Sequence, residues 1–148
     1  MNHGTSHHRV LTMVQFLLIY IDLLKEYNCN ATFFVLGNKV KIYKDTIKES
    51  ISNGNEIGNH SYNHKWLSRL KIEELKEQIN KTQDILKKEV NYTPILLRPT
   101  YGSVNKKIRN NTNLEIVLWN VDTLDWKIKS SKKIAERSLS QIKDRSII

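Results

Sequence analysis

The sequence has little cysteine, proline or glycine, and no long hydrophobic run. Its single cysteine, Cys29, cannot form an intrachain disulfide, so disulfide chemistry gives no guide to the cellular compartment. With two prolines and five glycines in 148 residues, the chain has no linker, low-complexity tract or internal repeat. The apolar stretch from Val10 to Ile21 is too short to span a bilayer and lacks the small-residue cleavage site of a signal peptide.

Positive charge is in excess: the sequence has 24 Lys and Arg against 15 Asp and Glu, a formal net charge of +9. A basic surface favours anionic partners. The basic residues are scattered and do not form a run with interleaved aromatic residues, so we do not expect nucleic-acid binding. Solvated helix faces account for most of them, and an anionic cell-wall polymer is compatible with the rest.

Strand and helix patterns alternate along the chain. The patterns predict helices near 16–27, 39–53, 70–90, 105–111 and 131–143, strands near 31–36, 56–59, 95–98 and 115–120, and the start of a strand at 146. This alternation favours a parallel sheet or barrel. A complete (β/α) barrel usually needs more than 148 residues. We therefore expect an α/β fold, a partial barrel with parallel strands, in a single domain over residues 1–148.

Polar residues follow three of the predicted strands. His60 and His64 come after the strand at 56–59, and on a helical turn this i, i+4 spacing would place both imidazoles on one face, where they could bind one metal ion. The spacing alone is weak, because two surface histidines in an Asn-rich loop have the same pattern. Arg98 to Gly102 and Asp122 to Trp126 follow the next two strands. Strand ends with polar residues are where α/β proteins keep their chemistry.

In this order the segments resemble the polysaccharide deacetylases, the NodB-homology domains of carbohydrate esterase family four. The family has five motifs on a distorted (β/α) barrel. Three are present: His-x-x-x-His as His60 and His64, Arg-Pro-x-Tyr-Gly as Arg98 to Gly102, and Asp-x-x-Asp-Trp as Asp122 to Trp126. The resemblance spans roughly Leu23 to Ile148. It implies hydrolysis of the N-acetyl groups of an amino-sugar polymer, either peptidoglycan or a chitin-like glycan.

The resemblance also implies a metal and a location. His60 and His64 would be neutral ligands of a divalent metal, usually zinc in this family, which lowers the pKa of a bound water and polarises the substrate amide. A bacterial cell-envelope or secreted location would suit the family, although no clear signal peptide is present. The partner would be an N-acetylated glycan polymer. We expect no membrane-spanning segment in this sequence.

Four further residues have roles that the resemblance implies. Tyr101 would bind substrate through its backbone N–H and stabilise the oxyanion of the tetrahedral intermediate. Trp126 would form a wall of the substrate pocket, with core packing as the alternative. Arg98 would pair with the catalytic aspartate, and Asp125 would orient the histidine that acts as the general acid. We expect Asp125, beside a large aromatic residue, to be partly desolvated.

Two family motifs have no match in this sequence. The first, Phe-Asp-Asp-Gly-Pro, supplies the catalytic base and the third metal ligand, but no Asp-Asp pair precedes Ala31. The fifth, a Leu-x-His segment that supplies the general acid, would follow a strand that begins only near Ser146. We therefore expect poor metal affinity. A catalytically inactive remnant with at most weak metal or glycan binding is the alternative to an active deacetylase.

The segment from Leu11 to Gln15 matches a frameshifted form of the first motif. Codons for Phe-Asp-Asp-Gly-Pro have the form TTY GAY GAY GGN CCN, and reading them one base late permits Leu-Thr-Met-Val-Gln at every position. The segment also lies about as far before Ala31 as the family places its first motif. Residues 1–22 are therefore either divergent or out of frame, and a chance match in a short window remains the alternative.

Overall fold

The computed structural model describes residues 18–144 and 146–148, in two compact units that we describe separately. The first unit ends at Ile116 and the second runs from Val117 to Ile148. In the first unit, residues 18–26 are helical and are followed by β1 (Thr32–Val35), α2 (Gly37–Val40), α3 (Lys44–Ser52), β2 (Glu56–Asn59), η1 (Leu67–Arg69), α4 (Ile72–Val90), β3 (Leu96–Leu97), η2 (Thr100–Gly102), α5 (Lys106–Asn110) and β4 (Glu115–Ile116). The second unit contains α6 (Ser131–Gln141). The single domain expected over residues 1–148 stays a prediction.

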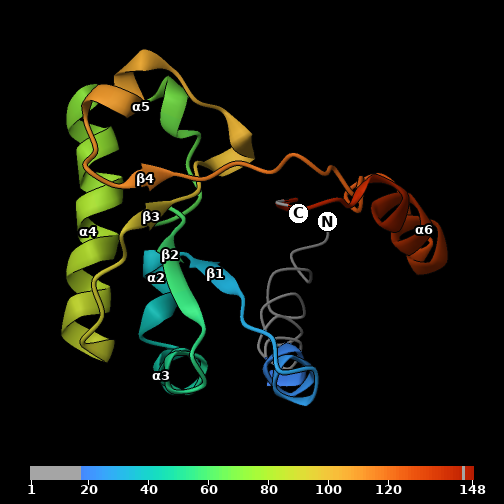
Figure 1. Ribbon diagram of the computed structural model, residues 1–148. Coiled ribbons are helices and arrows are strands. Elements are labelled where there is room, and N and C mark those ends of the chain that lie inside the picture. The colour runs from blue at the N-terminus through green and yellow to red at the C-terminus, as the bar shows by residue number, and fades with distance from the viewer. Residues whose placement is uncertain (1–17, 145) are drawn as a thin grey trace, which may run out of the picture. The chain divides into compact units, whose positions relative to one another are not determined.

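The strands of the first unit form one parallel sheet in the order β1-β2-β3-β4 (Figure 1). Helices α2 and α3 connect β1 to β2, and α4 connects β2 to β3, as parallel pairing requires. In the register of the sheet, Val35 pairs with Asn59 and Asn59 pairs with Leu97. The carboxyl ends of three neighbouring strands therefore lie at one edge. The predicted α/β class with parallel strands is confirmed.

Several predicted boundaries differ from the observed ones. The helix predicted over 39–53 is two helices, because the chain leaves helical geometry at Tyr43 (φ −116°, ψ 22°). The strand predicted over 115–120 extends only over 115–116, and no strand is assigned from 146 to 148. Within the second unit, the Ile147 carbonyl instead accepts the backbone N–H groups of Asn120 and Val121. Among the described residues, no helix is long and apolar enough to cross a membrane.

The long helix α4 covers the sheet and contributes to both hydrophobic clusters of the first unit (Figure 1). One cluster contains Val40, Ile47, Ile57, Leu86 and Val90, and the other contains Leu67, Leu75, Ile79, Leu97 and Ile108. The second cluster joins η1, α4, β3 and α5. It therefore provides a packed base for the loops that follow β2 and β3.

Two glycines allow the close packing of the segments around β2. Gly58 pairs with Phe34 across the sheet, and a Cβ atom at Gly58 would lie 2.3 Å from the Phe34 ring. At Gly37, where α2 begins, a Cβ atom would lie 2.6 Å from Thr82 Oγ1 and 2.7 Å from the Tyr62 ring. Larger residues at either position would displace the strand or the loop that follows it.

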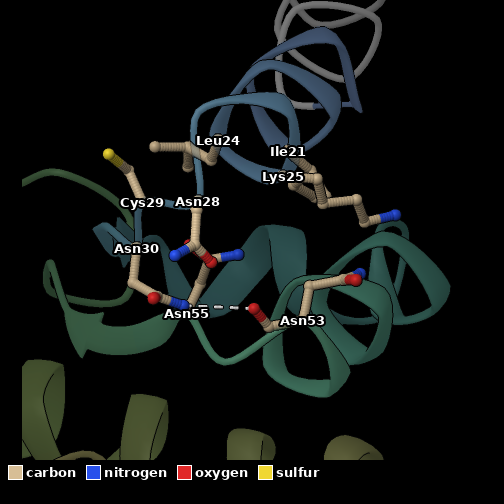
Figure 2. Close-up of a pocket in the computed structure, with 8 residues that line it drawn as sticks. All are labelled: Ile21, Leu24, Lys25, Asn28, Cys29, Asn30, Asn53 and Asn55. Atoms are coloured by element: carbon tan, nitrogen blue, oxygen red, sulfur yellow. Dashed lines mark hydrogen bonds between the residues drawn. The ribbon is translucent and has the colours of Figure 1, made fainter.

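A cavity of about 210 Å³ lies beside the amino ends of β1 and β2 (Figure 2). The Asn30 side chain donates a hydrogen bond to the Asn53 carbonyl at 3.1 Å, across the cavity. Cys29 is exposed, and its thiol, which donates to the Tyr27 carbonyl at 3.3 Å, points away from Asn53 and Asn55 in Figure 2. The only cysteine is therefore not a buried thiol.

Candidate active site

His60 and Arg98 follow directly after β2 and β3, at the carboxyl edge of the sheet. The His60 backbone N–H donates to the Val35 carbonyl and the Arg98 N–H donates to the Asn59 carbonyl, both at 3.0 Å. The His60 ring nitrogen Nδ1 lies 2.6 Å from the Arg98 carbonyl oxygen. Because a carbonyl only accepts, Nδ1 has the proton in this contact and Nε2 keeps its lone pair.

The surroundings of His60 favour the neutral imidazole. Burial lowers its pKa below the ordinary value of 6.5, the hydrogen bond to the Arg98 carbonyl opposes this shift, and electrostatic interactions with His64 and Arg98 lower the pKa further. Burial also lowers the pKa of the Arg98 guanidinium. Neutral imidazole is the form that binds metal ions.

The loop that contains both histidines is not the helical turn that their spacing predicted. Ser61 and His64 have φ values of +70° and +65°, in the left-handed region that non-glycine residues rarely adopt. The two imidazoles nevertheless lie together, with ring centroids 5.0 Å apart and planes at 69°. The convergence of the side chains comes from an irregular loop, which only its neighbours can stabilise.

Asn59, at the end of β2, stabilises this loop by hydrogen bonds that link it to α4. Its side chain is fully buried, and its Nδ2 donates to the Ile79 carbonyl and to Gln83 Oε1, both at 3.0 Å. Its Oδ1 accepts the Ser61 N–H at 2.9 Å, and Ser61 Oγ accepts the His64 N–H at 3.0 Å. This series of hydrogen bonds links α4 through Asn59 and Ser61 to the backbone of His64, and so holds His64 at a defined position relative to the helix.

Gln78 of α4 holds the outer part of the same loop. Its Oε1 accepts the backbone N–H groups of Tyr62 and Asn63, each at 3.2 Å. Sequence reasoning did not identify Gln78 or Asn59 as residues that position the site. Both could have been recognised in the sequence as polar residues at positions where an apolar residue is expected. Asn59 ends a buried strand, and Gln78 lies on the buried face of a helix.

The turn after β3 contacts the histidine loop. Thr100 is fully buried, and its hydroxyl donates to the Lys65 carbonyl at 2.6 Å and accepts the Leu67 N–H at 3.4 Å. Tyr101 follows with φ +60°, and its ring lies edge-on to His64 with centroids 5.0 Å apart. Strained backbone of this kind clusters at functional sites. The structure thus brings together four of the predicted site residues: His60, His64, Arg98 and Tyr101.

Trp66 and Arg69 extend this group, and sequence reasoning missed both. The Trp66 ring lies 4.6 Å from the Tyr101 ring at 30°, and the guanidinium carbon of Arg69 lies 3.6 Å from the Trp66 ring centroid. The signal for Trp66 was a large aromatic residue two positions after the second histidine of the motif.

The remaining predicted residues belong to the second unit. Asp122 Oδ1 accepts the Leu124 N–H at 3.0 Å, a local capping contact within the turn. Asp125 Oδ1 accepts the Thr123 hydroxyl at 2.9 Å. Asp125 is exposed, so the expected partial desolvation is not found, and Trp126 is 76% exposed, which argues against core packing. The roles of Asp125 and Trp126 at an active site stay predictions.

The two histidines fit a divalent metal by their chemistry. An imidazole whose Nδ1–H is held by a backbone carbonyl is the usual arrangement of a metal-binding histidine, because the contact fixes both the tautomer and the ring orientation. Over residues 18–144 and 146–148, the structure contains no group of three His, Cys, Asp or Glu side chains that could bind a metal. Leu11 to Gln15, the predicted position of the first motif, lies outside the described residues.

Relatives of known activity match most of this chain. It is 44% identical over 124 residues to the peptidoglycan-N-acetylmuramic acid deacetylase PdaC of Bacillus subtilis, and 36% identical over 128 residues to the peptidoglycan-N-acetylglucosamine deacetylase PgdA of Listeria monocytogenes. These matches cover 84% and 86% of this chain. The chain spans only 27% and 28% of the length of these relatives.

Solved structures agree with the sequence matches. The structure of PdaC from Bacillus subtilis is 43% identical, with a TM-score of 0.82 over 88% of this chain and 63% of that one. A family-four pseudoenzyme from Bacillus anthracis is 28% identical, with a TM-score of 0.80 over 87% of this chain and 47% of that one. The four parallel strands therefore correspond to part of the distorted (β/α) barrel of these deacetylases, as predicted.

A sequence model of one family matches residues 15–115. That match includes the strand ends, the histidine loop and the turn at Tyr101, the elements that bring the site together. The chain belongs to the polysaccharide deacetylase family.

Proposed function

We propose that this chain forms part of a metal-dependent hydrolase that removes N-acetyl groups from an amino-sugar polymer, peptidoglycan or a chitin-like glycan. One observation carries the proposal. The His60 ring is held at Nδ1 by the Arg98 carbonyl and lies 5.0 Å from the His64 ring, an arrangement that would suit one cation shared by both imidazoles. Burial lowers the pKa of His60, which favours the neutral form that such a cation would need. Family membership and the activities named for the relatives support the same chemistry.

In this proposal each side chain has a role set by its contacts. A divalent cation bound by His60 and His64 would act as a Lewis acid and supply a water of lowered pKa. The Arg98 carbonyl keeps the proton of His60 on Nδ1, so that Nε2 stays available as a ligand. The backbone N–H of Tyr101, in the strained turn at φ +60°, would stabilise the oxyanion, and the guanidinium of Arg98 would pair with the catalytic carboxylate.

A second candidate is an inactive member of the family that binds metal or glycan weakly. Two observations favour it: no third protein ligand stands among the described residues, and one of the similar solved structures is a pseudoenzyme. General acid and base groups each contribute roughly 10²–10⁴-fold to the rate. This sequence contains a match to neither motif that would supply them, so we expect little activity from the 148-residue chain.

The deciding experiment compares two proteins. One is the 148-residue chain, and the other has Leu11 to Gln15 replaced by Phe-Asp-Asp-Gly-Pro and a Leu-x-His segment added after Ile148. Acetate release from a chitin oligomer and from peptidoglycan fragments is measured with zinc. Release by the second protein that a chelator or His60→Ala abolishes would support the hydrolase. Zinc binding by that protein without acetate release from either glycan would favour the inactive member.

A further inference from the structure

We propose that Arg69, supported on Trp66, binds a carboxylate of the glycan, so that the site prefers an N-acetylated glycan with carboxylates over a neutral chitin-like one. The inference rests on the proposed function, because it assumes that a glycan occupies the surface beside His60 and His64. It selects between the two polymer classes that the sequence left open.

An unbroken series of side chains leads from a predicted metal ligand to this cation. The His64 and Tyr101 rings lie 5.0 Å apart, Tyr101 and Trp66 lie 4.6 Å apart, and the guanidinium carbon of Arg69 lies 3.6 Å from the Trp66 ring. Tyr101 is 57% exposed and Trp66 is 36% exposed. A sugar chain that places an acetamido group at His64 can therefore extend over Tyr101 towards Arg69.

The contact with Trp66 leaves the hydrogen-bonding capacity of Arg69 available. A guanidinium stacked on an aromatic ring uses its face, while its N–H donors lie in the plane and point outward. Among the described residues, none of the ion pairs involves Arg69, although the residue is exposed. A planar set of donors held in place is suited to bidentate binding of a carboxylate.

The local sequence around Arg69 is basic. Lys65 and Lys71 are exposed on either side of it, and the nearest acidic residues in the sequence are Glu73 and Glu74, in the first turn of α4. The positive potential of these basic side chains attracts anions. A chitin-like polymer has no charge to use this potential, whereas a peptidoglycan strand has a carboxylate on its lactyl ether or on the attached peptide.

The test measures equilibrium binding of the 148-residue chain, with zinc present, to two probes of equal length. One is a chitin oligomer and the other is a glycan strand that contains muramic acid. We expect the acidic strand to bind roughly fivefold more tightly, the upper range for an exposed ion pair, and we expect added salt to reduce the difference. Arg69→Gln should remove the preference, Arg69→Lys should keep part of it, and Trp66→Ala should weaken it because the guanidinium loses its support.

A matched control removes one positive charge elsewhere in the same unit. Lys48 is exposed on α3, and Lys48→Gln should keep the full preference. Equal binding of both probes, or a preference that survives Arg69→Gln, would overturn the inference and leave the proposed function standing. Binding of neither probe would count against the proposed function itself, and the inference would fail with it.

Discussion

Replacing Asn59 by leucine tests whether one buried amide determines the geometry of the histidine loop. The side chain is fully buried and makes three hydrogen bonds, two from Nδ2 and one into Oδ1 from the Ser61 N–H. Leucine has the same number and branching of side-chain heavy atoms as asparagine, so it leaves little cavity. The change therefore removes the hydrogen bonds while keeping the branched shape of the side chain.

The expected loss of stability follows from the three bonds. Each contributes about 1 kcal/mol net, and a buried donor left without a partner costs a further ~1–3 kcal/mol. The Ile79 carbonyl lies within α4 and keeps its helical donor, but the Ser61 N–H is buried and loses its acceptor. We expect the free energy of unfolding to fall by about 4 kcal/mol, a large part of the ~5–15 kcal/mol of an ordinary domain.

Urea unfolding followed by far-UV circular dichroism measures this loss. With a urea dependence of ~1–3 kcal/mol per M, a loss of about 4 kcal/mol should lower the midpoint by roughly 1–4 M. Asn63→Leu is the matched control, because Asn63 is exposed on the same loop and a surface change should stay within ~0.5 kcal/mol. Zinc affinity should also fall in Asn59→Leu and stay unchanged in Asn63→Leu. If both variants unfold at the same urea concentration, the buried amide does not hold the loop and our reasoning is wrong.

Three other predictions concern the metal, the pH and the coding sequence. The first uses a variant in which the other three of the five histidines are replaced by alanine. Calorimetric zinc titration of this variant should detect weak binding, and His60→Ala or His64→Ala should abolish it. A zinc affinity as high as that of a three-ligand site would contradict the loss of the first motif. Since burial lowers the pKa of His60 below 6.5 in the folded state, the unfolded chain binds more protons between the two pKa values. The metal-free free energy of unfolding should therefore fall as the pH drops below 7, and His60→Gln should flatten this dependence. The DNA that encodes Leu11 to Gln15 should encode Phe-Asp-Asp-Gly-Pro in the neighbouring frame; a frame without an Asp-Asp pair would make the match a coincidence.

Local sequence patterns predicted the regular elements well and the breaks between them poorly. The strand predicted at 56–59 is β2, and the helix predicted over 70–90 is α4 from Ile72 to Val90. Both have a sustained apolar periodicity, which is local information. The break between α2 and α3 was missed because the residues around Tyr43 include neither glycine nor proline.

The site was predictable to the extent that it follows from the order of its motifs. His60 contacts Arg98, and Tyr101 lies beside His64, because parallel strands end at one edge of the sheet. The loop geometry was not predictable in this way, because the groups that fix it are remote in sequence. The amide of Asn59 bonds to Ile79 and Gln83, 20 and 24 residues further along the chain.

The hydrogen bonds of the histidine loop also affect how a weak metal site should be interpreted. Ser61, His64 and Tyr101 all have positive φ, a conformation that costs free energy and persists only where the surroundings enforce it. Here those surroundings include protein groups, Asn59 and Gln78 among them, whose hydrogen bonds stabilise the loop that contains the two imidazoles. These hydrogen bonds lower the cost of ordering the loop when a cation binds. If zinc binds weakly to this chain, a small number of ligands is then a more direct explanation than a disordered loop.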